Sequence, residues 1–332
     1  AGSPNPRAYH CSFRNLRPGD EILSPVGKPY DTLEEVIGIR DSVGSLKEFG
    51  ITYSQVDLLP NGDFDFENIK KAINERTKLI EIQRSKGYAT RPTLSVKRIG
   101  ELISFIKSIK PDVICMVDNC YGEFVEELEP TDVGADMIVG SLIKNPGGGL
   151  APIGGYIVGR RDCVERAAYR LTAPGLGKEV GASLGVSQSL YQGLFLSPTV
   201  VAGALKGAIF AANVYEKLGF GVVPNGTESR HDIIQAIHLR NTGRRHQVLR
   251  GHPGGSAGGQ LRDSGAVAMP GYDSDVIMQQ ERSFRGPQSN FPQTVRSSRR
   301  TRYTSRRTHM VSCEARYLNV PSEVSGCRIV TL

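Results

Sequence analysis

Short apolar runs alternate with amphipathic stretches over residues 17–219, and this alternation constrains the fold more than any other feature of the chain. The stretch 94–110 has a helical period that ends before Pro111. The apolar runs are short and rich in β-branched residues; they lie at 79–83, 113–117, 137–141 and 154–159. Strands that alternate with helices form a mostly parallel sheet with helices on both faces. We therefore predict an α/β fold with a large domain over residues 17–219.

The charges are distributed unevenly along the chain. Residues 1–230 contain 13 Lys and 13 Arg against 27 acidic residues, a net charge of −1. Residues 231–332 contain 15 Arg and no Lys against 7 acidic residues, a net charge of +8. The overall charge of +7 therefore comes entirely from the last hundred residues.

Residues 220–332 are expected to form a smaller C-terminal α+β domain. The segment 220–239 reads as a strand, a loop and a second strand, and 268–278 again looks structured. Between and after these two segments, residues 240–267 and 279–332 show neither a helical nor a strand period.

Three interpretations compete for these irregular segments. The first is a basic tail that binds nucleic acid, which predicts mixed Lys and Arg with interleaved aromatic residues; Lys is absent and aromatic residues are sparse. The second is a disordered extension. The third is translation out of frame. Synonymous codons for 240–267, read with the first base dropped, give a string with helical period, a turn proline and balanced charge.

A shift of two bases over residues 279–306 gives a string that alternates like strands, and residues 1–15 behave in a similar way. We therefore predict that 240–267 and 279–332 are out of frame and that the small domain is disrupted. Residues 1–16 are expected to be an aberrant N-terminal segment, from a frame error or a truncation. The chain as written is then expected to be inactive.

An acid and a lysine follow two of the apolar runs. Asp118 ends the run VICMV, and Lys144 follows the run MIVGS by three residues and precedes Asn-Pro-Gly-Gly-Gly. In α/β sheets, ligands bind beyond the carboxyl ends of the strands, where both residues fall. Pyridoxal phosphate needs a lysine for a Schiff base and an acid for its pyridinium nitrogen. The alternatives are a surface lysine and an aspartate that caps a helix.

Burial of the Lys144 stem is expected to lower the pKa of its amine, which would leave the amine free to attack an aldehyde.

Two segments of the chain, residues 17–239 and 268–278, resemble the methionine gamma-lyase-related family that is often labelled "aluminium resistance protein". The resemblance rests on LRPGDEILSPVGKPYDTLEEVIGIR, IQRSKGYATRPTL, VDNCYGEFVEELEPTDVGADMIVGSLIKNPGGG, RLTAPGLGKEVGAS and AMPGYDSDVIM. It implies a fold-type-I, pyridoxal-phosphate-dependent fold whose large domain holds a seven-stranded mixed sheet. The family's glycine-containing phosphate loop would fall at residues 1–15.

The resemblance also implies the function and the roles of site residues. It implies a carbon–sulfur lyase that acts on a sulfur amino acid, in the manner of methionine gamma-lyase or cystathionine lyase. Lys144 would form the Schiff base and then act as the base at Cα, and Asp118 would pair with the ring nitrogen. Tyr121 would bind the ring hydroxyl, as in aminotransferases, or would simply be packed. Ser141 would contact the phosphate.

Three residues after the run at 79–83 are weaker candidates for binding a substrate carboxylate: Arg84, Lys86 and Tyr88. The histidines fit no zinc pattern, so we expect no metal. Cysteines without regular pairing indicate reduced thiols and a cytoplasmic protein. We expect a homodimer or homotetramer that binds an amino-acid substrate and neither nucleic acid nor membrane. An aminotransferase or aldolase on the same fold, or a non-catalytic nucleic-acid-binding protein, are the alternatives.

Overall fold

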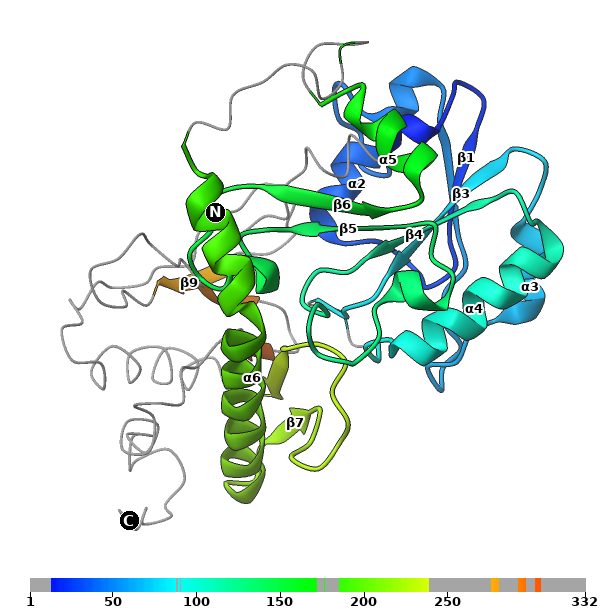
Figure 1. The fold of residues 1–332 in the computed structure, drawn as a ribbon. Helices are drawn as coiled ribbons and strands as arrows, with labels where there is room; N and C mark the ends of the chain where they lie inside the picture. The colour runs from blue at the N-terminus through cyan, green and yellow to red at the C-terminus, as the bar shows by residue number, and fades with distance from the viewer. Residues whose placement is uncertain are drawn as a thin grey trace.

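The computed structural model describes residues 13–87, 89, 91–171, 176 and 185–238, and the backbone of three further strands at 276–280, 292–296 and 302–305. Its main feature is a six-stranded sheet of order β2-β1-β3-β4-β5-β6 (Figure 1). The first five strands in this order are parallel, and β6 pairs with β5 in the antiparallel direction. The strands are β1 (Glu21–Ser24), β2 (Thr52–Gln55), β3 (Thr77–Gln83), β4 (Ile114–Asp118), β5 (Met137–Ser141) and β6 (Gly155–Gly159).

Helices cover both faces of this sheet. One apolar cluster lies on each face of the sheet, because the side chains of successive strand residues point to opposite sides. On one face, α3 (Phe66–Ala72) and α4 (Val96–Ile109) pack on a cluster that includes Ile80 and Val117. On the other face, α2 (Asp31–Ile37), α5 (Arg161–Ala168) and the 3-10 helix η1 (Phe13–Asn15) pack on a cluster that includes Met116. The remaining 3-10 helices are η2 (Leu46–Phe49), η3 (Pro130–Val133) and η4 (Asn145–Gly147).

Helix α4 shows how local sequence sets these elements. The Ser95 side chain caps its first turn by accepting a hydrogen bond from the Arg98 N–H, which satisfies one of the free amide donors there. Its buried residues recur every three or four positions and form one apolar stripe toward the sheet; they are Val96, Ile99, Leu102, Ile103 and Ile106. The helix ends just before Pro111, as predicted.

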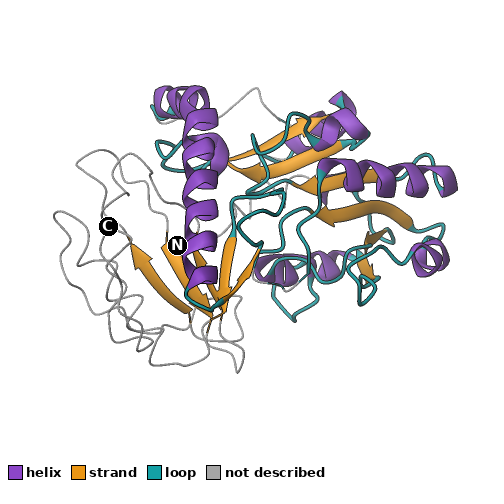
Figure 2. Cartoon of the chain, turned by 90° about the horizontal axis from the view of Figure 1, so that it is seen from below, coloured by secondary structure: helices purple, strands orange, loops and turns teal. Residues whose placement is uncertain are grey.

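The longest element is the helix α6 (Ser187–Lys217), which contains Pro198. Figure 2 shows α6 beside the second sheet of the protein, and it also contacts η4. Among the described residues, α6 is the one helix that is long and apolar enough to cross a membrane by length and composition. A third of its most apolar stretch is buried inside the protein.

The second sheet is antiparallel and has the order β7-β8-β11-β10-β9. Its strands are β7 (Gly221–Val223), β8 (Gln235–His238), β9 (Val276–Gln280), β10 (Pro292–Arg296) and β11 (Arg302–Ser305). The first two confirm the predicted strand, loop and strand over 220–239. Strands β10 and β11 lie in the segment 279–332 that we expect to be out of frame. Residues 240–267 lie outside the described residues, as does most of 1–16.

Candidate active site

Asp118 and Ser141 end neighbouring parallel strands on the same side of the main sheet. Asp118 is paired with Val139 across β4 and β5, and Ser141 lies two residues beyond Val139, so both side chains point to the face of α2 and α5. Asp118 is 4% exposed, and its Oδ1 accepts a hydrogen bond of 3.0 Å from the Cys120 N–H. The structure therefore fixes a buried carboxylate at the carboxyl edge of the sheet.

Lys144 lies at the same edge and is also buried, with 5% of its surface exposed. Its Nζ lies 4.2 Å from the ring centroid of Tyr121 and 5.9 Å from that of Tyr30. Burial lowers the pKa of Lys144, but its interactions with Cys120, Tyr121, Asp118 and Tyr30 raise it more, so that the net pKa lies above its ordinary value. The expected lowering of this pKa was therefore wrong for the protein without a ligand, because burial acts together with these neighbours.

Tyr121 has an unusual backbone. Its φ is 72°, in the left-handed region that bulky residues rarely adopt. Such a conformation costs about 1–3 kcal/mol and persists where surrounding contacts impose it. The buried Tyr121 packs with Cys120, Val201, Ala204, Ile233 and Ile234, so contacts from α6 and from the segment just before β8 hold its ring beside Lys144. The structure thus brings Asp118, Tyr121, Ser141 and Lys144 together.

The Ser141 hydroxyl is fully buried, and its Oγ has no hydrogen-bond partner among the described residues. A buried polar group without a partner costs about 1–3 kcal/mol, so such groups often await a ligand or water. Ser141 is therefore available to an oxygen-rich group bound at this edge.

The glycine run after Lys144 serves helix packing. A Cβ on Gly148 would lie 2.3 Å from the carbonyl oxygen of Gly193 in α6, and a Cβ on Gly193 would lie 2.2 Å from that of Gly147. The Ser197 hydroxyl adds a hydrogen bond of 2.7 Å to the Pro146 carbonyl. These glycines bring the Lys144 loop and α6 into backbone contact.

Arg84 has a different role from the predicted one. It is fully buried, and its guanidinium donates to Asn119 Oδ1 at 2.8 Å and forms ion pairs with Glu126 at 2.8 Å and Glu129 at 3.3 Å. Asn119 follows Asp118 directly, and alternation along the strand turns it to the other face of the sheet. The prediction that Arg84 binds a substrate carboxylate is corrected, because its guanidinium is engaged in this internal network.

Lys86 lies in the loop after β3 and contacts the second sheet. It is 4% exposed, and its Nζ donates to the Val223 carbonyl of β7 at 3.1 Å. In the same loop, the hydroxyls of Ser85 and Thr93 each donate to Asp232 Oδ2 at 2.7 Å. The structure therefore ties Lys86 to the small domain. Tyr88 lies outside the described residues.

The structure adds residues that the sequence did not single out. Tyr30 comes from the turn before α2, and only the fold brings it to Lys144. Glu123 is buried; the Tyr156 hydroxyl donates to its Oε1 at 2.8 Å, and the Asn145 side chain donates to its carbonyl at 3.0 Å. Burial raises the pKa of Glu123 to about 8, although the Tyr156 hydrogen bond opposes this shift. The sequence signal that could have pointed to Glu123 is its position five residues after Asp118, which ends β4.

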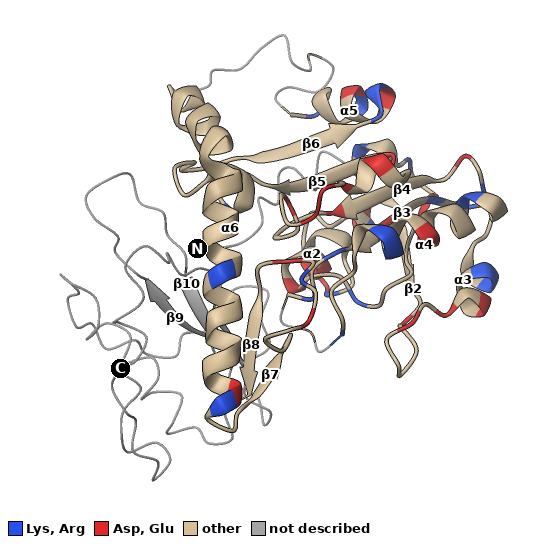
Figure 3. Ribbon diagram, turned by 60° about the horizontal axis from the view of Figure 1, so that its bottom comes forward, with Lys and Arg blue, Asp and Glu red and all other residues tan. Residues whose placement is uncertain are grey.

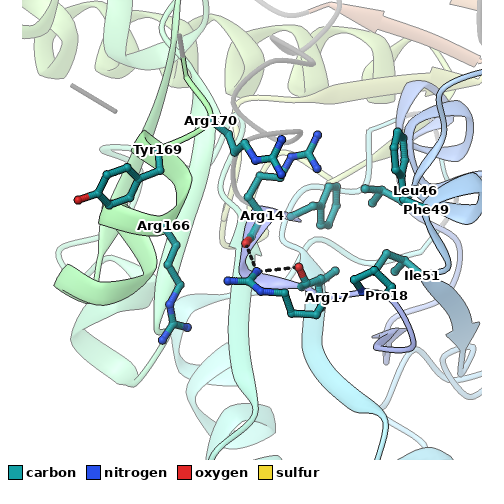
Figure 4. Close-up of a pocket in the computed structure, with 11 residues that line it drawn as sticks. Arg14, Arg17, Pro18, Leu46, Phe49, Ile51, Arg166, Tyr169 and Arg170 are labelled. Carbon is teal, nitrogen blue, oxygen red and sulfur yellow. Dashed lines mark hydrogen bonds between the residues drawn. The ribbon is translucent and has the colours of Figure 1, made fainter. Parts of the chain in front are cut away.

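A cavity of about 420 Å³ lies elsewhere, at the amino ends of β1 and β2 (Figure 4). Four arginines line it, namely Arg14, Arg17, Arg166 and Arg170, together with the apolar residues Leu46, Phe49 and Ile51, and the side chains of Arg14 and Arg170 lie side by side. The Arg17 guanidinium donates to the carbonyls of Arg14 and Leu16. None of the predicted site residues lines this cavity. Among the described residues, no group of three or more His, Cys, Asp or Glu could hold a metal ion.

Comparisons with known proteins agree with this architecture. A carbon–sulfur lyase involved in aluminum resistance from Clostridium novyi NT has a solved structure that is 42% identical, with a TM-score of 0.82 over 91% of this chain and 73% of that chain. A solved protein from Bacillus cereus is 45% identical, with a TM-score of 0.82 over 91% of this chain and 77% of that chain. The fold-type-I prediction, with a mixed and mostly parallel sheet, is confirmed, although the described residues form six of the seven expected strands.

Among curated proteins, YnbB of Bacillus subtilis (strain 168) is 50% identical over 268 residues, or 80% of this chain. The chain spans 64% of the length of that relative. The model of the family "Methionine gamma-lyase" matches residues 8–292. This match covers most of the chain, and the chain therefore belongs to the methionine gamma-lyase family.

Proposed function

We propose that this protein is a pyridoxal-phosphate-dependent carbon–sulfur lyase that acts on a sulfur amino acid, with Lys144 as its catalytic residue. The observation that carries the proposal is the position of Lys144, buried at the carboxyl edge of the sheet within the electrostatic reach of Asp118 and beside the ring of Tyr121. Family membership and the lyase from Clostridium novyi NT support the reaction class.

The residues at this edge fit pyridoxal phosphate. Lys144 supplies the amine, and Asp118 supplies a carboxylate for the ring nitrogen. The unpartnered Ser141 hydroxyl suits a phosphate oxygen. The rings of Tyr30 and Tyr121 offer aromatic faces on which a planar heterocycle can pack.

When bound, the cofactor supplies an electron sink for the negative charge that develops at the substrate Cα. The Asp118 carboxylate, oriented by the Cys120 N–H, would pair with the ring nitrogen and keep that nitrogen protonated. The Lys144 amine takes the proton from Cα, for which it must first be neutral. The pKa of this amine lies above its ordinary value because Cys120, Tyr121, Asp118 and Tyr30 together favour the ammonium form, so the amine must lose a proton before it can act as this base.

The proposed partner is a second copy of the chain, in a homodimer or homotetramer. Helix α6 carries almost no charged side chains over most of its length (Figure 3). Several of its large apolar residues are exposed, with Tyr191 at 74% and Phe195 at 83%. An exposed apolar patch of this kind marks an interaction surface.

Reduction with borohydride in the presence of pyridoxal phosphate tests the proposal. We expect a covalent adduct on Lys144, which mass spectrometry locates. The experiment uses the chain as written and a restored chain, in which residues 1–16, 240–267 and 279–332 are recoded in the shifted frame, and an adduct in either one supports the proposal. Lys144→Ala should abolish the adduct, and the exposed Lys47→Ala is the matched control. An adduct that persists in Lys144→Ala would exclude Lys144.

An aminotransferase is the second candidate, because Tyr121 follows Asp118 by three residues and a histidinol-phosphate aminotransferase from Caldicellulosiruptor saccharolyticus is 35% identical over 120 residues. The restored chain should convert a sulfur amino acid to a keto acid, ammonia and a thiol without an amino acceptor. Turnover that requires a keto-acid acceptor would favour the aminotransferase instead.

A further inference from the structure

A second buried acid, Glu81, lies next to Asp118. Glu81 is fully buried in β3 and is paired with Met116 of β4, while Gln83 is paired with Asp118. Met116 and Asp118 are two residues apart on one strand, so alternation turns Glu81, Met116 and Asp118 to the same side of the sheet. No function in the site described above requires this acid.

The hydrogen bonds of Glu81 in the described part of the chain are too few to satisfy a buried carboxylate. The Ser24 hydroxyl lies 2.7 Å from the Gly27 carbonyl oxygen and 3.3 Å from Glu81 Oε2. A hydroxyl has one hydrogen and a carbonyl only accepts, so the shorter contact takes the Ser24 hydrogen. Glu81 Oε2 therefore receives at most a long, shared hydrogen bond from the Ser24 hydroxyl, which stabilises an ionised Glu81 only slightly. Its other oxygen, Oε1, has no partner among the described residues.

The groups that face Glu81 from the neighbouring elements are few. Asp118 of β4 and Tyr53 of β2 lie within electrostatic reach, and so does Arg91, which precedes α4. Burial and then Asp118 raise the pKa of Glu81 to about 8, while Arg91 and the Ser24 hydrogen bond oppose this shift. The Arg91 guanidinium is itself hydrogen-bonded to the carbonyls of Pro92 and Ser85.

We propose that Glu81 is a positioning residue that stays protonated beside Asp118 and leaves the single negative charge of this acid pair on Asp118. Ionisation of both acids would place two negative charges in a buried site, a cost that a shared proton removes. The role toward the cofactor rests on the proposed function, because it is Asp118 that would face the ring nitrogen. Glu81 thus sets how much negative charge that nitrogen meets.

The protonation of Glu81 is tested on the cofactor-free full-length chain. Infrared difference spectroscopy between wild type and Glu81→Gln should show the carbonyl band of a protonated carboxylic acid at neutral pH, and this band should be lost as the pH rises through about 8. The exposed Glu67→Gln, on α3, is the matched control and should not remove it. The band of the other buried acid, Glu123, is common to both proteins and cancels in the difference spectrum. Absence of a protonated-acid band from the wild type minus Glu81→Gln difference spectrum would overturn the proposal.

The effect on the site is measured by pyridoxal phosphate binding to the restored chain as a function of pH. Wild type should show an inflection in affinity near pH 8 that Glu81→Gln lacks. A merely structural role would change affinity equally at every pH and would overturn the positioning role. If neither protein binds pyridoxal phosphate, the proposed function fails, and the infrared band alone decides whether Glu81 holds its proton.

Discussion

At the scale of single residues, the buried acid Glu123 should make stability depend on pH. Its pKa is raised from 4.5 to about 8, so the folded protein binds this proton more tightly than the unfolded chain. Its contribution to the free energy of unfolding is therefore complete below about pH 4.5 and declines as the pH rises to about 8, by at most about 1.4 kcal/mol per pH unit.

Glu123→Gln should flatten this decline in the free energy of unfolding, measured with urea at several pH values. The surface variant Glu67→Gln should leave it unchanged. A decline of equal slope in wild type and Glu123→Gln would contradict the assigned pKa.

The sequence predicted the residues that lie at strand ends and missed those that depend on tertiary contacts. Asp118, Ser141 and Lys144 follow apolar strands, and parallel topology alone brings such positions to one edge. Tyr30 is separated from Lys144 by 114 positions, and no local pattern connects them. The sequence suggested Arg84 as a substrate-binding cation, because the acids that pair with it, Glu126 and Glu129, come from a later loop that no local pattern connects to it.

At the scale of elements, the contact between α6 and the Lys144 loop depends on Gly193. A Cβ added there would meet the Gly147 carbonyl oxygen at 2.2 Å, and backbone cannot move aside cheaply. Gly193→Ala should lower the free energy of unfolding by about 1–3 kcal/mol, as overpacking does. It should also weaken the borohydride-trapped adduct, because the displaced loop carries Lys144.

Gly203 provides the matched control on the same helix. A Cβ there meets nothing within 4 Å, so Gly203→Ala should raise stability by about 0.5–1 kcal/mol through helix propensity alone. Urea unfolding of both variants measures the difference. Equal stabilisation by the two substitutions would show that the close contact at Gly193 does not restrain the loop.

The strands and helices of the main sheet were predictable because each carries its own pattern. Helix α4 has a cap, an apolar stripe and a proline stop, and β4 and β5 are fully buried apolar runs. The second sheet was predictable only at β7 and β8. Strands β10 and β11 pair through backbone groups, which any sequence provides, so their residues gave no period to detect.

At the scale of the whole molecule, the exposed face of α6 should hold copies of the chain together. Phe195→Asp would place a charge on this face and should reduce the mass measured by light scattering to that of one chain, 36.1 kDa. Val43→Asp is the control, because Val43 is 96% exposed in a turn far from α6 in sequence. A wild-type protein that is already monomeric would contradict the proposed partner.

The last prediction concerns the small domain and the proposed frame errors. Ile233 and Ile234, at the start of the small domain, pack on Tyr121 and Cys120, so the packing of that domain supports the ring beside Lys144. The segments that should complete the domain lie within residues 231–332, where 15 Arg and no Lys occur and apolar periodicity is lost.

We therefore expect no release of keto acid by the chain as written and measurable release by the restored chain. Lys144→Ala in the restored chain is the control and should be inactive. A restored chain that keeps residues 1–16 as written separates the two damaged regions: its activity would show that the small domain alone limits turnover. Equal turnover by the written and restored chains would exclude frame errors as a cause of inactivity, because the strained Tyr121 would then be held without a restored small domain.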